Sequence, residues 1–130
     1  MTARALVFPV FCLCAGPALA DPTLECSVTV ETQIEIVECL TAIDANVTAA
    51  LEQVLSFARN AAEQLDADTG RPESVPALEA SQAAWEAYRD AQCGYIGSTW
   101  AGGSGTGSAI GACRIELARD RIDALFASLP

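Results

Sequence analysis

The chain has 130 residues, no histidine, seven basic and seventeen acidic residues, and a formal net charge of −10 at pH 7. So acidic a surface repels nucleic acid and anionic lipid, which argues against either as a partner. The absence of histidine excludes serine–histidine and cysteine–histidine nucleophiles and removes the commonest metal ligand.

The first 20 residues are typical of a secretory signal peptide. One positive charge, Arg4, precedes the apolar run "ALVFPVFCLCAG", and "ALA" at positions 18–20 has the small-x-small pattern of a cleavage site. The run is too short for a transmembrane helix, and neither Cys12 nor Cys14 follows the small residue that lipidation requires. We therefore expect cleavage before Asp21, and a periplasmic or secreted mature chain that is neither membrane-inserted nor lipid-anchored.

The mature segment, residues 21–130, has the length of one domain and carries six arginines against seventeen acidic residues, a net charge of −11. Its four cysteines are Cys26, Cys39, Cys93 and Cys113. In an oxidising compartment an even number of cysteines indicates disulfides, and four cysteines allow three pairings. We favour Cys26–Cys39 and Cys93–Cys113, because each pair flanks one local loop. The wide spacings and the absence of a C-x-x-C motif argue against a structural zinc site.

Helical periodicity dominates from Thr32 to about Leu65. Apolar residues recur every three or four positions, at Ile36, Leu40, Ile43, Val47, Leu51, Val54, Ala58, Ala61 and Leu65. This pattern predicts a long amphipathic helix, whose weakest point is the segment Asp44–Asn46. The following "DADTGRPESVP" combines Asp, Gly and two Pro, which predicts a polar loop with Ser74 as N-cap of the next helix.

Two further helices are predicted in the second half of the chain. The first runs from about Pro76 to Gly94, and the second from about Ala112 to Leu129. On the first, one face carries Leu78, Ser81, Trp85, Tyr88 and Gln92; on the second, the buried stripe is Ile115, Ala118, Ile122, Leu125 and Leu129. Seven of the nine glycines lie between Gly94 and Gly111, which predicts an irregular, flexible stretch. The expected fold is all-α: a small antiparallel bundle of three to four helices stapled by two disulfides.

Other local motifs have ordinary structural explanations. "DADTGRPE" suggests a calcium loop, but it lacks a third acidic position before the glycine and the terminal bidentate glutamate. "GGSGTGS" offers backbone N–H groups to an anion, but no strand precedes it and no P-loop lysine follows. Every Asp and Glu fits a solvated helix face or a loop, so no catalytic carboxylate pair stands out. We expect no enzyme activity, no metal and no cofactor.

Trp85, Arg89 and Cys93 are spaced four residues apart and share one face of their helix. Trp85 has the size to anchor a core that contains few aromatic residues. Arg89 can lay its stem on the same surface and donate to a carboxylate or to helix-end carbonyls. The candidate carboxylates are Glu86, Glu116 and Asp120. Arg121 should project from the facing helix.

A longer motif includes these residues. It reads L-x-x-x-Q-x-x-W-x-x-x-R-D-x-x-C, then a glycine-rich loop, then C-x(7)-R-x-x-x-L. The matching residues are Leu78, Gln82, Trp85, Arg89, Asp90, Cys93, Gly102, Gly103, Ser104, Cys113, Arg121 and Leu125. With this motif the chain resembles the LprI family of small secreted proteins, whose namesake is described as a lysozyme inhibitor. It departs from the family pattern in the first helix, where Thr48, Leu51–Glu52 and Leu55 replace an aspartate, Leu-Asn and a tyrosine.

The resemblance implies a secreted, non-catalytic binding protein that inhibits a cationic lysozyme-type enzyme, with motif residues that are mainly structural. We expect contact through the loop between the last two cysteines, while acidic side chains steer the approach. Trp100 in this loop is either an aromatic anchor for the partner or a lid folded back on the core. The alternative is a structural or interaction module of the cell envelope with no enzyme target.

Overall fold

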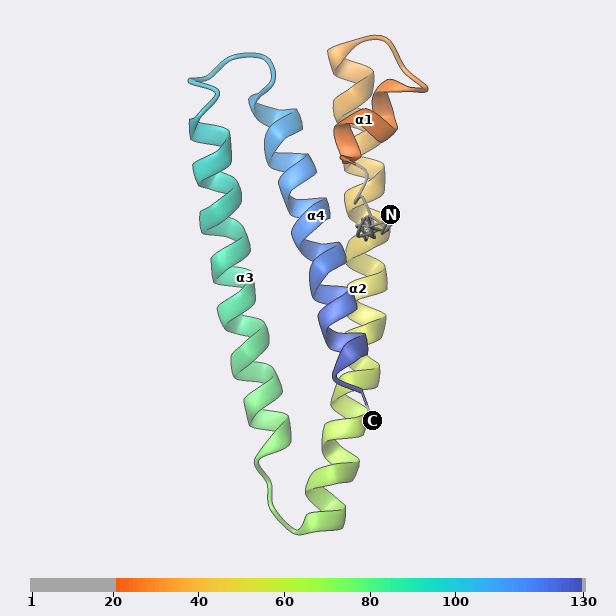
Figure 1. The fold of residues 1–130 in the computed structure, drawn as a ribbon, viewed down its shortest axis with the longest axis vertical. Coiled ribbons are helices and arrows are strands. Elements are labelled where there is room, and N and C mark those ends of the chain that lie inside the picture. Colours follow the sequence, from red (N-terminus) through yellow and green to blue (C-terminus); the bar gives the residue numbers. More distant parts are fainter. Residues whose placement is uncertain (1–20, 130) are drawn as a thin grey trace, which may run out of the picture.

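The computed structural model describes residues 21–129, and the expected signal peptide, residues 1–20, lies outside this part of the chain. Its helices are α1 (Pro22–Ser27), α2 (Gln33–Thr69), α3 (Ser74–Ser98) and α4 (Thr106–Ala127). The three long helices run antiparallel to their chain neighbours, and α1 folds back beside the start of α2 (Figure 1). No strand occurs within the described range, so the all-α prediction is confirmed.

The long helix α2 is continuous over 37 residues, so the weak segment Asp44–Asn46 does not interrupt it. A capping box starts the helix: the Thr32 hydroxyl accepts from the Glu35 N–H at 3.3 Å, and the Glu35 carboxylate accepts from the Thr32 N–H at 3.0 Å. The helix ends at Gly70, whose φ of 67° is left-handed and favours glycine. α2 ends four residues beyond the predicted Leu65.

The core lies mainly between α2 and α4, in two clusters of buried side chains. One cluster contains Leu51, Val54, Ala58, Ala118 and Leu125, with Leu78 and Trp85 of α3 packed against it. The other contains Cys26, Ile36, Leu40 and Ile115. Leu65, the last apolar position of the predicted amphipathic helix, is 53% exposed. The reason is that α4 ends before it reaches the far end of α2 (Figure 1).

Both predicted disulfides are present. Cys26 and Cys39 lie with their Cα atoms 5.9 Å apart, and their bond fastens α1 to α2. Cys93 and Cys113 lie 5.6 Å apart between Cα atoms, and their bond fastens α3 to α4.

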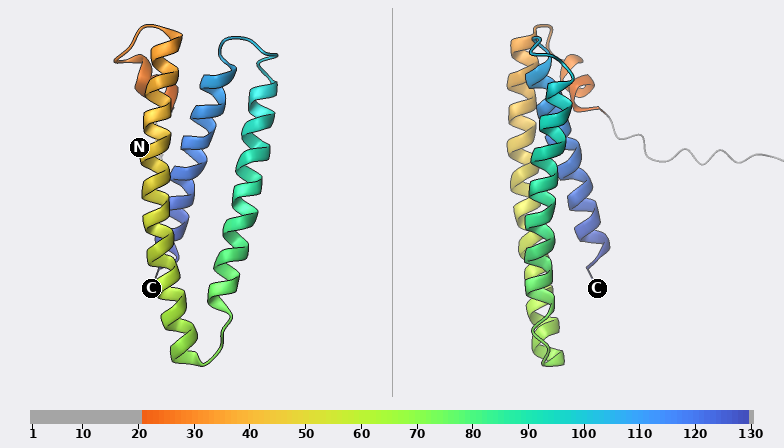
Figure 2. Two further views of the ribbon diagram at one scale, coloured as in Figure 1. Left: turned by 180° about the vertical axis from the view of Figure 1, so that it is seen from behind. Right: turned by 90° about the vertical axis from the view of Figure 1, so that its left-hand side faces the viewer.

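The six-residue helix α1 was not predicted from the sequence. The Asp21 carboxylate caps it by accepting from the Thr23 N–H at 2.8 Å, and Pro22 occupies its first position. Arg119 of α4 donates to both carboxylate oxygens of Glu25, at 2.8 and 3.0 Å, and this hydrogen bonding lowers the pKa of Glu25. A helix of six residues is unstable on its own. The ion pair with Arg119 and the disulfide to α2 therefore stabilise α1. Figure 2 shows α1 on the same side of the bundle as α4.

The glycine-rich segment Gly94–Gly111 is mostly helical, so the prediction of an irregular stretch was wrong at both ends. α3 continues to Ser98, and α4 already begins at Thr106, so only the residues between them form a loop. A side chain at Gly97 would meet the Ile110 side chain at 2.6 Å, and glycine therefore allows α3 and α4 to approach closely. Close packing explains the glycine at position 97, whereas a side chain at Gly94 or Gly107 would meet open space.

The start of α3 was also predicted incorrectly, because Ser74 does not cap it. The Asp66 carboxylate, from the last turns of α2, accepts from the backbone N–H groups of Glu73, Ser74 and Val75 at 3.2, 2.8 and 3.1 Å. Partial burial raises the pKa of Asp66, but the hydrogen bonds from Ser74 and Val75 outweigh this effect, and the pKa is lowered. The "DADTGRPE" segment is therefore a helix end and a polar turn, as the preferred interpretation had it.

Candidate functional site

The hydrogen bonds of the Arg89 side chain stay on its own helix, α3. Its Nε and Nη2 atoms donate to Oδ1 of Asp90, both at 3.0 Å, and its guanidinium lies over the Trp85 ring, 5.2 Å from the centroid. The predicted acceptors Glu86, Glu116 and Asp120 are therefore wrong. With the Arg89 guanidinium over the Trp85 ring, the neighbouring Asp90 is the carboxylate that accepts its hydrogen bonds.

Arg121 of α4 forms hydrogen bonds with α3. It projects toward that helix as the sequence predicted. It donates from Nε to the Gln82 side-chain oxygen and from Nη2 to the Ser81 hydroxyl, both at 3.1 Å. Gln82 in turn donates to Glu86 at 3.0 Å. With Leu78, Trp85 and Leu125 packed in the core, the motif residues of α3 and α4 mostly contact each other within the bundle.

The remaining motif residues, Gly102, Gly103 and Ser104, form the turn between α3 and α4. Gly102 has a φ of 77°, in the left-handed region, and the Gly103 N–H donates to the Trp100 carbonyl at 2.9 Å. The Trp100 ring lies directly over Gly105, where any Cβ atom would collide with it. Trp100 is 52% exposed, so it is neither buried as a lid nor fully free.

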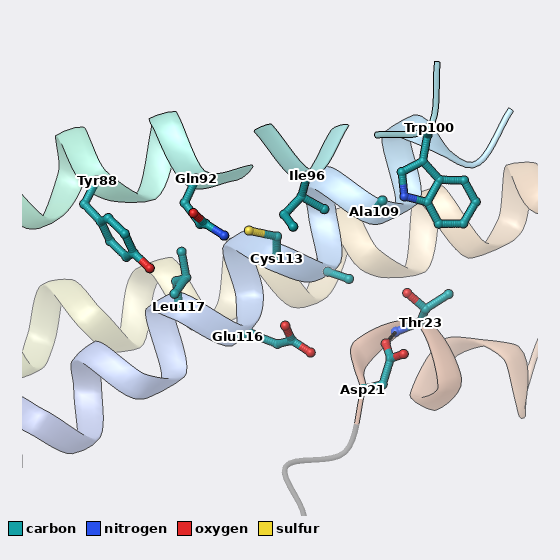
Figure 3. A pocket seen from close by; sticks show the side chains of 11 residues that line it. Asp21, Thr23, Tyr88, Gln92, Ile96, Trp100, Ala109, Cys113, Glu116 and Leu117 are labelled. Atoms are coloured by element: carbon teal, nitrogen blue, oxygen red, sulfur yellow. Dashed lines mark hydrogen bonds between the residues drawn. The ribbon is translucent and has the colours of Figure 1, made fainter. Parts of the chain in front are cut away.

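A surface cleft of about 350 Å³ opens beneath Trp100, between α1, α3 and α4 (Figure 3). Its lining residues are Asp21, Thr23, Tyr88, Gln92, Ile96, Trp100, Ala109, Ala112, Cys113, Glu116 and Leu117. Of these residues, Trp100 is the one predicted from the sequence as a contact residue. Tyr88 lies twelve positions before Trp100, three steps of four residues, so its spacing could have suggested a shared surface. No sequence pattern indicated that Glu116 of α4 and Asp21 would lie at the same place.

The cleft is acidic on one side and aromatic at its two ends. Figure 3 shows the Glu116 side chain extending from α4 toward Asp21, the residue before α1, with Tyr88 and Trp100 at opposite ends. Partial desolvation raises the pKa of Glu116, and the negative charges of Asp21 and Asp120 raise it further. Arg119 opposes this shift but is already engaged by Glu25. The cleft therefore holds negative charge that its own cations do not fully compensate.

A second cleft, of about 320 Å³, lies at the other end of the bundle where α4 stops. It is lined mainly by small and apolar side chains, among them Ala61, Leu65, Leu78 and Leu129. Within residues 21–129, no three potential metal-ligating side chains come together. No helix in that same range has both the length and the apolar character needed to cross a bilayer.

Fold and cleft together define a small, disulfide-linked helical protein with an acidic, aromatic-lined surface site. Residues 25–125 match the family model described as "Lysozyme inhibitor LprI". The chain therefore belongs to the LprI family, as the resemblance indicated. The match includes both disulfides and most of the three long helices. No curated protein and no solved structure matches the chain.

Proposed function

We propose that this protein is a secreted or periplasmic, non-catalytic binding protein that inhibits a cationic lysozyme-type enzyme. The observation that carries the proposal is membership of a family described as lysozyme inhibitors, over residues 25–125. Two disulfides suit a protein that folds in an oxidising compartment, in keeping with the expected signal peptide.

The charge of the chain supports a cationic partner. Six arginines against seventeen acidic residues give the mature segment a net charge of −11. Four of the six arginines form ion pairs with carboxylates of the chain itself: Arg59, Arg71, Arg89 and Arg119. An oppositely charged enzyme would be attracted from a distance, which raises the association rate at low ionic strength.

Inhibition in this proposal is steric. The bundle presents the Trp100 loop and the cleft beside it on one end, and a protein docked there would cover part of the enzyme's substrate groove. Disulfides at Cys26–Cys39 and Cys93–Cys113 fix the elements that carry this surface, so little conformational entropy is lost on binding.

The test is a cell-wall lysis assay with a cationic c-type lysozyme and the purified mature chain, residues 21–130. We expect dose-dependent inhibition that weakens as ionic strength rises from about 0.01 M to about 0.15 M, since the Debye length falls over this range. An unrelated acidic protein of similar charge serves as the control for nonspecific attraction.

No inhibition of any of several lysozymes, at concentrations on the order of tens of micromolar, would contradict the proposal. A tight partner from the cell envelope that is not a hydrolase would favour the alternative, an interaction module with no enzyme target.

A further inference from the structure

We infer that the cleft between α1, α3 and α4 receives one cationic side chain, arginine or lysine, of the partner protein. This inference rests on the proposed function and names the surface that makes the contact. Its basis is the combination of aromatic rings, facing carboxylates and size within one cleft.

The aromatic ends of the cleft suit a cation. Tyr88 is 54% exposed and Trp100 is 52% exposed, so both rings are accessible to a ligand. An ammonium or guanidinium group is attracted to the face of such a ring, most strongly to tryptophan. The Trp100 ring is also fixed in place, because it packs directly on Gly105 at the N-terminus of α4.

Two carboxylates in the cleft supply negative charge that complements a bound cation. The Glu116 side chain extends toward Asp21 in Figure 3, and no hydrogen bond or ion pair joins Glu116 to another described side chain. Among residues 21–129, the Asp21 carboxylate accepts one hydrogen bond, from the backbone N–H of Thr23. Because Arg119 is held by Glu25 at 2.8 Å, a cation from outside would relieve the repulsion between the two carboxylates.

The size of the cleft fits a side chain better than a larger ligand. Its volume of about 350 Å³ lies near the lower end of the range for small-molecule sites. An anionic saccharide or phosphate would face both carboxylates and is disfavoured. The occupant is therefore a single basic side chain that projects from the enzyme surface.

The first experiment measures binding of the mature chain to a cationic c-type lysozyme by calorimetry. We expect Glu116→Gln and Trp100→Ala each to weaken binding at least about tenfold, because the first removes a carboxylate and the second an aromatic ring that hold the cation. Glu63→Gln on α2 is the matched control, since it removes the same charge outside the cleft and should change the affinity less than about twofold. Circular dichroism verifies that each variant folds.

The outcomes separate the inference from the proposed function. If wild type inhibits lysozyme and both cleft variants bind equally well, the inference is overturned while the proposed function stands. If wild type does not bind lysozyme, the proposed function fails, and the cleft is then tested with argininamide as a small cationic probe.

In that second experiment, argininamide should change the tryptophan fluorescence of wild type at concentrations up to about 0.1 M, whereas neutral glutaminamide should not. The change should be lost in Trp100→Phe, which retains Trp85, and reduced in Glu116→Gln. An unchanged spectrum with argininamide overturns the inference.

The mature N-terminus provides one more test. Cleavage before Asp21 would leave a free α-amino group at the rim of the cleft, where its positive charge competes with an incoming cation. Acetylation of this group removes the charge, so the acetylated chain should bind the same lysozyme at least as tightly as the unmodified chain. Weaker binding after acetylation contradicts a cation site.

Discussion

Glu116 connects the stability of the protein with the cleft. Its pKa is raised above the ordinary value of 4.5 because the carboxyl is partly desolvated and lies near Asp21 and Asp120. A raised pKa in the folded state means that protonated Glu116 favours folding. That contribution is complete below pH 4.5 and is lost as pH rises through the folded-state pKa. At neutral pH the ionised side chain therefore opposes folding slightly.

Glu116→Gln should consequently stabilise the protein at pH 7, by less than about 0.5 kcal/mol because solvent screens this accessible carboxyl. Below the ordinary glutamate pKa, wild type and variant should have equal stability. Thermal unfolding at both pH values measures the difference. The opposite effects on stability and on partner binding distinguish a binding residue from a structural one. A variant that is less stable than wild type at pH 7 would contradict this account.

Apart from the disulfides, the residue contacts predicted best were those set by spacing along one helix. The four-residue spacing of Trp85 and Arg89 correctly placed them on one face, and the chain supplied Asp90 as the acceptor within reach. The sequence could not predict that Glu116 lies close to Asp21, because this proximity depends on where α1 packs against the bundle. Trp100 likewise owes its position to Gly105, whose packing role has no signature in the sequence.

At the scale of elements, the turn between α2 and α3 depends on one carboxylate. Asp66 accepts three backbone N–H groups at the start of α3, where no side chain of α3 itself forms a cap. Its pKa is lowered, so its contribution to stability is present above the ordinary value of 3.8 and is lost as pH falls through the folded-state pKa.

Asp66→Ala should therefore lower the midpoint of thermal unfolding at pH 7, because three N–H groups lose their acceptor. The difference from wild type should shrink as pH falls below 3.8. Asp68→Ala is the matched control: Asp68 accepts one hydrogen bond from Gln64 at the surface, at 2.9 Å, and its loss should matter less. Equal effects of the two substitutions would show that Asp66 does not cap α3.

Hydrophobic periodicity predicted the long helices well, because the stripes on α2 and α4 pack against each other. The same periodicity did not predict where the long helices begin and end. Composition cannot distinguish a glycine that loosens the chain from one that lets two helices touch, and Gly97 belongs to the second kind. The helix α1 was missed because six residues are too few for a periodic pattern.

At the scale of the whole molecule, the two disulfides hold together a bundle with a small core. Cys93–Cys113 joins residues 20 apart in sequence, and Cys26–Cys39 joins residues 13 apart. The pairing was predictable, since each bond closes a local loop between successive helices. The short connections between the long helices also predicted that these helices pack side by side around one core. The position of α1 was not predictable in this way.

Replacing Cys93 and Cys113 with alanine should lower the free energy of unfolding by about 3 kcal/mol, because the unfolded chain regains the freedom of the closed loop. Urea unfolding of the double variant and of wild type measures the loss. Wild type treated with a reducing agent should unfold at the same urea concentration as a variant that lacks all four cysteines. An unchanged midpoint in the double variant would contradict a stabilising role.

The attachment of α1 has a consequence for when the protein becomes active. One side of the cleft is Asp21, and α1 reaches that position through one disulfide and the ion pair between Arg119 and Glu25. In the reducing cytoplasm the Cys26–Cys39 bond does not persist, and a helix of six residues detaches readily. A chain without this bond would therefore lack one side of the cleft. Under the proposed secretion and cation site, oxidation after export would complete the cleft, so binding of the target would begin only outside the compartment of synthesis.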